Sequence, residues 1–325
     1  MINVQQLFRS EGKAGDIGIE VEVETDRRSY IDLKDIPNWT VHGEGSLKGY
    51  GVEYVIITPM KRKHLEKNIT DLFNALDKDE ANVLQSQNTS VHVHVNVQKL
   101  TLESTVRFAL YYLLLEPILM KMLDPHRIGN VFCVQSEFVD YTKLLESICR
   151  GHVPNLQECK YGSINLGVLK KFGTLEFRAL HFPCTKEELI KWVDILLAIR
   201  NLAETMDATD FINNLSLMGI VDLVNQYIPE LSEAVEQEDQ EKVLENMYPY
   251  QEIIFNTLGR KDYEDMNEYY KDPNQFITGT FIGGKELLED TKMLREMGIV
   301  RPAPPPPPRL RDEFRAGRPV RGDRY

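Results

Sequence analysis

Cysteine and long apolar runs are scarce in this sequence of 325 residues. Its four cysteines include no Cys-x-x-Cys pair, so the sequence indicates neither a disulfide framework nor a cysteine-rich zinc site. The most apolar stretch, 108–123, is interrupted by Glu116, Pro117 and Lys121 and is too polar to span a membrane. The first residues contain no apolar leader-like segment. We therefore expect a cytoplasmic protein with reduced thiols and no membrane contact.

Basic residues are outnumbered, with 38 Lys and Arg against 50 Asp and Glu, and the formal net charge is −12. Nucleic-acid backbones attract Lys and Arg, so we expect no nucleic-acid partner. Residues 301–325 are the exception, because they hold seven arginines, no lysine and three acidic residues. They also contain five consecutive prolines, Pro304–Pro308, which favour a solvated polyproline segment. This composition predicts a Pro/Arg-rich disordered tail, and a protein partner for that tail stays open.

Helical spacing of apolar residues dominates after about residue 185, where Thr185 and Glu188 have the spacing of a capping box. The expected helices lie near 62–78, 101–123, 136–150, 186–199, 208–226, 229–247 and 285–297. The segment Gly279–Lys285 has the Gly-x-x-x-x-Gly-Lys spacing of a phosphate loop. Glu286 follows it where Ser or Thr would be needed for Mg²⁺, so we interpret this segment as a turn before the last helix.

Residues 15–182 contain segments in which polar and apolar residues alternate, as is typical of strands. The three strongest are 18–24, 90–97 and 174–180, and two weaker ones are 51–57 and 161–166. Their polar sides present Glu20, Glu22, Glu24, Glu53, His92, His94, Asn96, Ser163, Asn165, Glu176 and Arg178. A polar side is usually a solvated sheet face, but carboxylates and imidazoles that converge are ligands for divalent metal. We therefore predict an α+β fold whose curved, mainly antiparallel sheet binds metal on its polar face.

The composition of this polar face indicates which metal ion and which type of reaction to expect. Glutamates outnumber histidines, which favours Mg²⁺ or Mn²⁺ over Zn²⁺. Arg178 lies two residues after Glu176 and therefore points to the same side of its strand. A guanidinium binds phosphate or carboxylate through two hydrogen bonds, so metal and arginine together suggest phosphoryl transfer from a nucleotide.

The ordered motifs resemble the amidoligase family over about residues 15–200. They are Gly18-x-Glu20-x-Glu22, Trp39, Gly45-Ser46-Leu47, Gly51-x-Glu53, His92-x-His94, Tyr161 with Asn165, and Gly173-Thr-x-Glu176-x-Arg178. This family belongs to the carboxylate–amine ligases with the glutamine-synthetase-like fold. The resemblance implies a curved sheet with helices packed behind it. It also implies ATP-dependent joining of a small-molecule or peptide carboxylate to an amine through an acyl phosphate, with ATP and Mg²⁺ or Mn²⁺.

The resemblance also implies roles for individual residues. The implied metal ligands are Glu20, Glu22, Glu53, His92 and Glu176. The implied catalytic residues are Arg178, Glu176 and Arg127. The implied nucleotide-binding residues are His94, Arg178, Asn165 and Ser46. We expect an amidoligase-like catalytic domain over 1–200, a helical C-terminal extension over 201–300 packed on it, and the disordered tail over 301–325; assembly into a homo-oligomer stays open.

Two other functions fit parts of the pattern. A zinc-dependent hydrolase could use His92 and His94 with Glu176 or Glu20 as a third ligand, but it would leave several glutamates and Arg178 without a task. A ligase-like scaffold without catalytic activity could bind a larger assembly through the tail. Metal retention and nucleotide binding distinguish these alternatives from a ligase.

Overall fold

The computed structural model describes residues 2–13, 15–29, 31–131, 133–254 and 258. Its centre is a six-stranded sheet in the order β2-β3-β1-β4-β6-β5, in which every neighbouring pair is antiparallel. The strands are β1 (Ile17–Val23), β2 (Trp39–Gly43), β3 (Val52–Ile56), β4 (Val91–Asn96), β5 (Ile164–Asn165) and β6 (Thr174–Phe177). The chain is therefore a mixed α/β protein with an antiparallel sheet.

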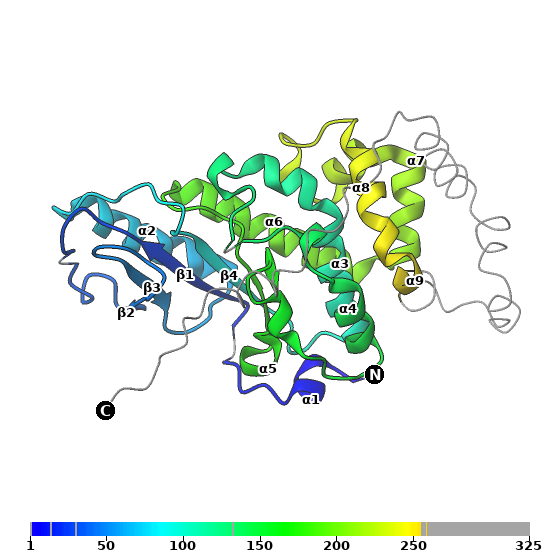
Figure 1. Ribbon diagram of the computed structural model, residues 1–325, viewed down its shortest axis with the longest axis horizontal. Helices are drawn as coiled ribbons and strands as arrows, with labels where there is room; N and C mark the ends of the chain where they lie inside the picture. Colours follow the sequence, from blue (N-terminus) through cyan, green and yellow to red (C-terminus); the bar gives the residue numbers. More distant parts are fainter. Residues whose placement is uncertain (1, 14, 30, 132, 255–257, 259–325) are drawn as a thin grey trace, which may run out of the picture.

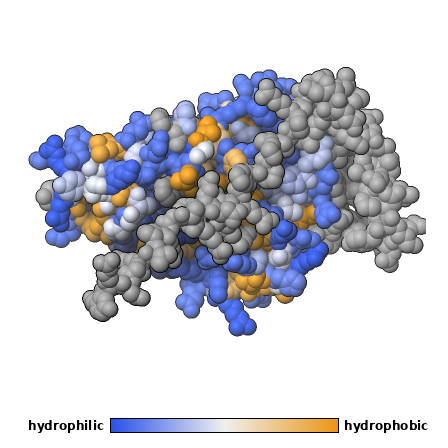
Figure 2. Space-filling model, viewed as in Figure 1, coloured by the Kyte–Doolittle hydropathy of each residue, from blue (hydrophilic) through white to orange (hydrophobic). Residues whose placement is uncertain are grey.

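Helices lie against this sheet and extend beyond one end of it (Figure 1). They are α1 (Val4–Phe8), α2 (Arg62–Lys78), α3 (Leu102–Leu119), α4 (Tyr141–Cys149), α5 (Leu169–Phe172), α6 (Lys186–Thr205), α7 (Ala208–Tyr227), α8 (Asp239–Met247) and α9 (Gln251–Ile253). Short 3₁₀ helices follow or link them at Met120–Met122, Pro125–Arg127, Ser136–Phe138, Leu156–Cys159, Pro229–Leu231 and Tyr248–Tyr250. In the same view, hydrophilic residues cover most of the described surface, and smaller apolar patches lie between them (Figure 2).

One face of the sheet is apolar and is covered by helices. The odd-numbered side chains Val93 and Val95 of β4 are fully buried, and α6 packs against this strand. On β6, the ring of Phe177 contacts Phe108 and Tyr112 of α3, with ring centroids 5.2 and 4.8 Å apart. Side chains alternate between faces along a strand, so the even-numbered residues of β4 and β6 must project from the opposite face.

The helices after residue 200 share one hydrophobic core with the sheet and α3. Helix α3 is buried along almost its whole length, and α6 and α8 both pack against it. Asn246 of α8 donates a hydrogen bond to the carbonyl of Leu113 at 3.1 Å, and the Lys121 ammonium lies 2.8 Å from the Asp239 carboxylate. The expected helix at 285–297, the Gly279–Lys285 segment and the tail at 301–325 lie outside the described residues.

The structure confirms most of the expected elements and adds one. The capping box is present, because Thr185 Oγ1 accepts from the Glu188 amide at 3.1 Å and Glu188 accepts from the Thr185 amide at 2.6 Å. Strand β2 was not expected, and β5 is much shorter than the expected 161–166. The expected helix at 229–247 is reduced to a 3₁₀ turn followed by α8. Within the described ranges, no helix has the length and apolarity needed to cross a bilayer.

Candidate active site

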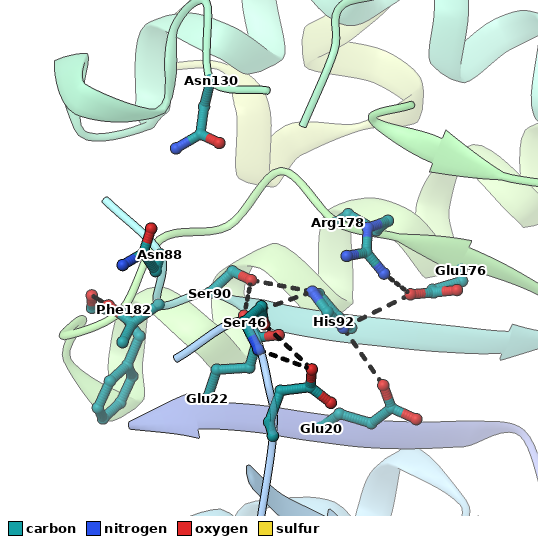
Figure 3. A network of polar contacts seen from close by, with 12 residues as sticks. Glu20, Glu22, Ser46, Asn88, Ser90, His92, Asn130, Glu176, Arg178 and Phe182 are labelled. Atoms are coloured by element: carbon teal, nitrogen blue, oxygen red, sulfur yellow. Dashed lines mark hydrogen bonds and ion pairs between the residues drawn. The ribbon is translucent and has the colours of Figure 1, made fainter. Parts of the chain in front are cut away.

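The pairing of the strands brings the candidate residues together on the polar face. Strand β1 lies between β3 and β4, and its register sets Glu20 beside His92 and Glu22 beside Glu53. Strand β6 continues the face on the other side of β4, where Glu176 pairs with His94. Because all pairs are antiparallel and in register, residues from four separate strands form one cluster, and Figure 3 shows its members from β1, β4 and the end of β6.

Glu20 is the centre of this cluster. Its Oε2 atom lies 3.2 Å from His92 Nδ1, and its Oε1 atom lies 3.3 Å from His94 Nε2. His92 Nδ1 is also 3.5 Å from Oε1 of Glu176. His92, His94 and Glu176 are each less than a tenth exposed, whereas the Glu20 side chain is 23% exposed. Glu20 is therefore accessible to a ligand, whereas the side chains around it are buried.

Two groups of three side chains have the geometry to hold a cation. One consists of Glu20, His94 and Glu176, and the other of Glu20, Glu53 and His92. Within each group, one potential ligand atom from each residue lies within 4.8 Å of the other two. Carboxylate oxygens and neutral imidazole nitrogens are normal ligands of divalent metals. The two groups share Glu20, so they offer two adjoining positions at which a cation could be held.

The ionisation of these groups reflects crowded negative charge. Burial, together with the neighbouring charges of Glu20 and Glu22, raises the pKa of Glu53 to about 7. Burial opposes ionisation of Glu20 as well, but hydrogen bonds to His92 and His94 outweigh it and lower the Glu20 pKa. For His94, burial disfavours the charged form, yet the hydrogen bond to Glu20 raises its pKa overall. A bound cation would offset the repulsion that Glu53 experiences.

Two neighbours hold Glu176 by both of its carboxylate oxygens. Asn165 of β5 donates from Nδ2 to Oε2 at 2.7 Å, and the Arg178 guanidinium donates to Oε1 at 2.5 Å. Asn165 Oδ1 in turn accepts from the amide of Gly167 at 2.8 Å, which fixes the orientation of its side chain. The Arg178 side chain is 13% exposed and lies beside Glu176 on the same face (Figure 3). Asn165 is thus placed to orient Glu176, and Arg178 can reach a ligand over the cluster.

Glu22 occupies one end of the cluster and belongs to neither group of three. It accepts a hydrogen bond from the hydroxyl of Ser90, whose oxygen is 2.9 Å from His92 Nε2. Glu22 itself lies 3.7 Å from that nitrogen. Sequence reasoning missed Ser90, although its position two residues before His92 in an alternating strand was a usable signal.

Ser46 and Arg127 are placed differently from the other candidates. Ser46 is exposed on a loop, where its amide and hydroxyl donate to Glu44 at 3.2 and 3.1 Å. Arg127 is only 2% exposed, and its guanidinium donates to the backbone carbonyls of Arg178 at 2.7 Å and Ala179 at 3.4 Å. Arg127 therefore supports the backbone that carries Arg178, and its catalytic role stays a prediction.

Glu24 is a further residue that sequence analysis left without a role. Its carboxylate is 5% exposed and accepts hydrogen bonds from the Lys48 amide at 2.7 Å and the Asn88 side chain at 3.3 Å. These bonds join the loop that carries Ser46 to the loop that precedes β4. Glu24 thus shapes the Glu22 end of the site without being part of the cluster.

A cleft of about 470 Å³ opens beside the opposite end of the cluster. Glu20 and His94 form part of its wall, so the cleft is continuous with the cluster. The remaining wall combines apolar residues such as Ile57, Pro59 and Phe172 with charged residues of both signs, which are Lys13, Lys171, Glu11 and Asp16. The ring of Phe172 meets the His94 ring edge-on with centroids 5.7 Å apart. The cleft therefore offers apolar surface and two ammonium groups, along with two acidic side chains, next to the cluster.

The chain matches a protein-family model. The family model described as "Putative amidoligase enzyme" matches residues 22–200, which is more than half of the chain. The matched range contains most of the cluster and Arg178. It begins two residues after Glu20. No curated protein matches the chain.

Proposed function

The chain belongs to the amidoligase family, and from that premise we propose that it is an ATP-dependent carboxylate–amine ligase that works through an acyl phosphate. One observation carries this proposal: two three-residue cation groups share Glu20, with Arg178 beside them. The proposal includes the finer classification of the sheet as glutamine-synthetase-like.

The residues present fit Mg²⁺ or Mn²⁺. Glu20, His94 and Glu176 would hold one ion, and Glu20, Glu53 and His92 would hold a second. Such ions neutralise the charge on the phosphates of a bound nucleotide and orient the transferred phosphoryl group. Glu22 would act beside them by fixing Ser90 and the ring of His92.

Arg178 would bind the transferred phosphoryl group. Its guanidinium is kept in place by Glu176 and is always charged, so it stabilises the oxygens on which negative charge accumulates. In the first step an oxygen of the substrate carboxylate attacks the terminal phosphorus of ATP, and the bond to the bridging oxygen breaks to release ADP. In the second step the amine nitrogen attacks the acyl carbon, phosphate leaves, and the nitrogen loses a proton.

The 470 Å³ cleft is the proposed position of the nucleotide. Its apolar residues, Ile57, Pro59 and Phe172, suit a flat base, and Lys13 and Lys171 suit phosphate oxygens. The cleft ends at Glu20 and His94, so a nucleotide lying in it would direct its terminal phosphate toward the cluster and Arg178. This position agrees with the expectation that His94 faces the nucleotide.

The geometry supports a ligase better than a zinc hydrolase. Among the described residues, the two candidate cation groups contain one histidine each, so neither unites His92 with His94. A hydrolytic zinc site built on both histidines would need that union. The ligase proposal also uses Arg178 and the glutamates that the zinc alternative, with Glu176 or Glu20 as its third ligand, leaves without a task.

Calorimetric titration of the full chain with ATP, with and without Mg²⁺, tests the proposal. We expect Mg²⁺-dependent binding that weakens about tenfold or more in Glu176→Gln, because this substitution removes a ligand charge at almost constant shape. Glu66→Gln is the matched control, since it removes the same charge from an exposed position on α2. If the folded wild type binds no ATP when Mg²⁺ or Mn²⁺ is present, the ligase function is refuted. A tightly retained zinc ion would then favour the hydrolase, and a partner captured by residues 301–325 would favour the scaffold.

A further inference from the structure

Glu116 is a buried carboxylate that the proposed reaction does not use. It lies in α3, where almost every other side chain is buried and most are apolar, and it is 3% exposed. Burial raises the pKa of Glu116, although hydrogen bonds from Ser136 and Ser163 oppose this effect. A buried carboxyl group is costly, and a well-packed apolar residue at such a place is often equally stable or more so. Core packing alone therefore does not account for it.

The two oxygens of Glu116 bind two different segments of the chain. Oε2 accepts from the amide of Ser136 at 2.8 Å and from the hydroxyl of the same residue. Oε1 accepts from the hydroxyl of Ser163, which is completely buried. The two segments also contact each other, because the amide of Ser163 donates to the carbonyl of Val134 at 2.8 Å. Glu116 thus joins the end of α3 to the residue that precedes β5.

Ser163 leads directly to the candidate active site. Its carbonyl accepts from the backbone amide of Arg178 at 2.9 Å. Two residues further on, Asn165 pairs with Glu176 in the sheet and donates to its carboxylate at 2.7 Å. Strand β5 has only two residues, so ladder hydrogen bonds alone give it little support. Glu116 and the hydroxyl of Tyr141, which donates to the Ile164 carbonyl at 2.5 Å, supply that support from the helical layer.

We propose that Glu116 is a positioning residue, which holds Ser163 and β5 so that Glu176 keeps its place in its cation group and Arg178 keeps its place beside it. The inference rests on the proposed function, since Glu116 has this task only if Glu176 and Arg178 act as described above. It assigns a role to a residue that touches neither metal nor nucleotide. The two carboxylate oxygens allow this role to be distinguished from a purely structural one. Oε1 binds Ser163, whose carbonyl accepts from the Arg178 amide, whereas Oε2 binds Ser136, which is further from the site along this chain of hydrogen bonds.

Ser163→Ala and Ser136→Ala form a matched pair that separates the roles of the two oxygens. Each removes one hydroxyl that donates to Glu116, and we expect each to lower the thermal midpoint by about 2–4 °C. Ser163→Ala should weaken Mn²⁺ binding about tenfold, as loss of a residue that supports a metal ligand does. It should also accelerate hydrogen exchange in the peptide that spans 174–180, which contains the Arg178 amide. Ser136→Ala should leave both quantities at the wild-type level.

Two substitutions of Glu116 itself test whether a conservative change retains Mn²⁺ affinity. Glu116→Gln keeps an acceptor for the Ser136 amide, and its amide group can donate to Ser163, so Mn²⁺ affinity should stay close to wild type. Glu116→Leu should reproduce the loss seen in Ser163→Ala. Equal Mn²⁺ affinity and equal exchange at 174–180 in the two serine variants would overturn the positioning role. A folded wild type that binds no Mn²⁺ would overturn the proposed function instead, and the exchange comparison would still decide whether Glu116 holds Arg178.

Discussion

The strongest electrostatic consequence of the cluster concerns the proton on Glu53. Burial, followed by the charges of Glu20 and Glu22, raises the pKa of this carboxyl to about 7. A cation binds the ionised form, so the proton must leave when metal enters the group formed by Glu20, Glu53 and His92. Metal affinity should therefore fall as the pH falls through 7, and metal binding should release protons.

The magnitude follows from the position of this pKa. With a pKa of about 7, roughly three-quarters of the Glu53 side chains carry a proton at about pH 6.5, and roughly one in ten does at about pH 8. Binding of Mn²⁺ at the lower pH should thus release about 0.75 proton from Glu53, in addition to any proton released by His94, whose pKa is also raised. The Glu53 contribution should almost disappear at the higher pH.

Calorimetry in two buffers of different ionisation enthalpy counts these protons. We expect Glu53→Gln to release about 0.75 proton fewer than the wild type at about pH 6.5, while the exposed control Glu66→Gln releases the wild-type number. The contribution of His94 is common to all three proteins and cancels in the comparison. If Glu53→Gln and the wild type release the same number of protons, Glu53 does not lie at a cation site, and the account of crowded carboxylates is wrong.

Three other substitutions and one truncation test separate parts of the protein. Arg178→Lys should reduce turnover by about 100-fold or more with an unchanged circular dichroism spectrum, because an ammonium cannot span two phosphate oxygens; full turnover would remove Arg178 from the mechanism. Glu20→Gln should weaken binding of both metal equivalents in a Mn²⁺ titration, whereas Glu22→Gln should weaken binding less, and the reverse order would contradict the grouping around Glu20. Truncation after Val300 should leave Mg²⁺-dependent ATP binding and turnover unchanged, and loss of turnover by a folded truncated chain would refute the expected domain organisation.

The sequence was sufficient to predict the strands that form the site, because alternation is a local property. The valines of β4 and the histidines between them can be assigned to opposite faces from a few consecutive residues. The same reasoning identified Glu20, Glu53 and Glu176 as residues of a polar face. It did not find β2, a short strand at the edge of the sheet that pairs only with β3.

What the sequence could not provide is the distance between residues from different strands. The register that sets Glu20 beside His92 joins residues 72 positions apart and depends on the whole sheet. Glu116 appeared only as an interruption in an apolar helix, because its partners Ser136 and Ser163 lie 20 and 47 residues away. Arg127 was expected to be catalytic, and its burial against the carbonyl of Arg178 depends on where the short 3₁₀ helix Pro125–Arg127 lies, which no sequence pattern describes.

The sharing of Glu20 between the two cation groups follows from the topology of the sheet. Strand β1 is flanked by β3 on one side and β4 on the other, so a side chain in its middle can be reached from both neighbours. Glu20 occupies that place, with Val55 on one side and His92 on the other, whereas Glu22 lies two pairs nearer the end of the strand. A slip of β1 by one residue would turn all its carboxylates toward the helices and bring valines to the polar face. The buried Ile17, Ile19 and Val21 resist that slip, so the apolar side of β1 fixes the position of the ligand on its polar side.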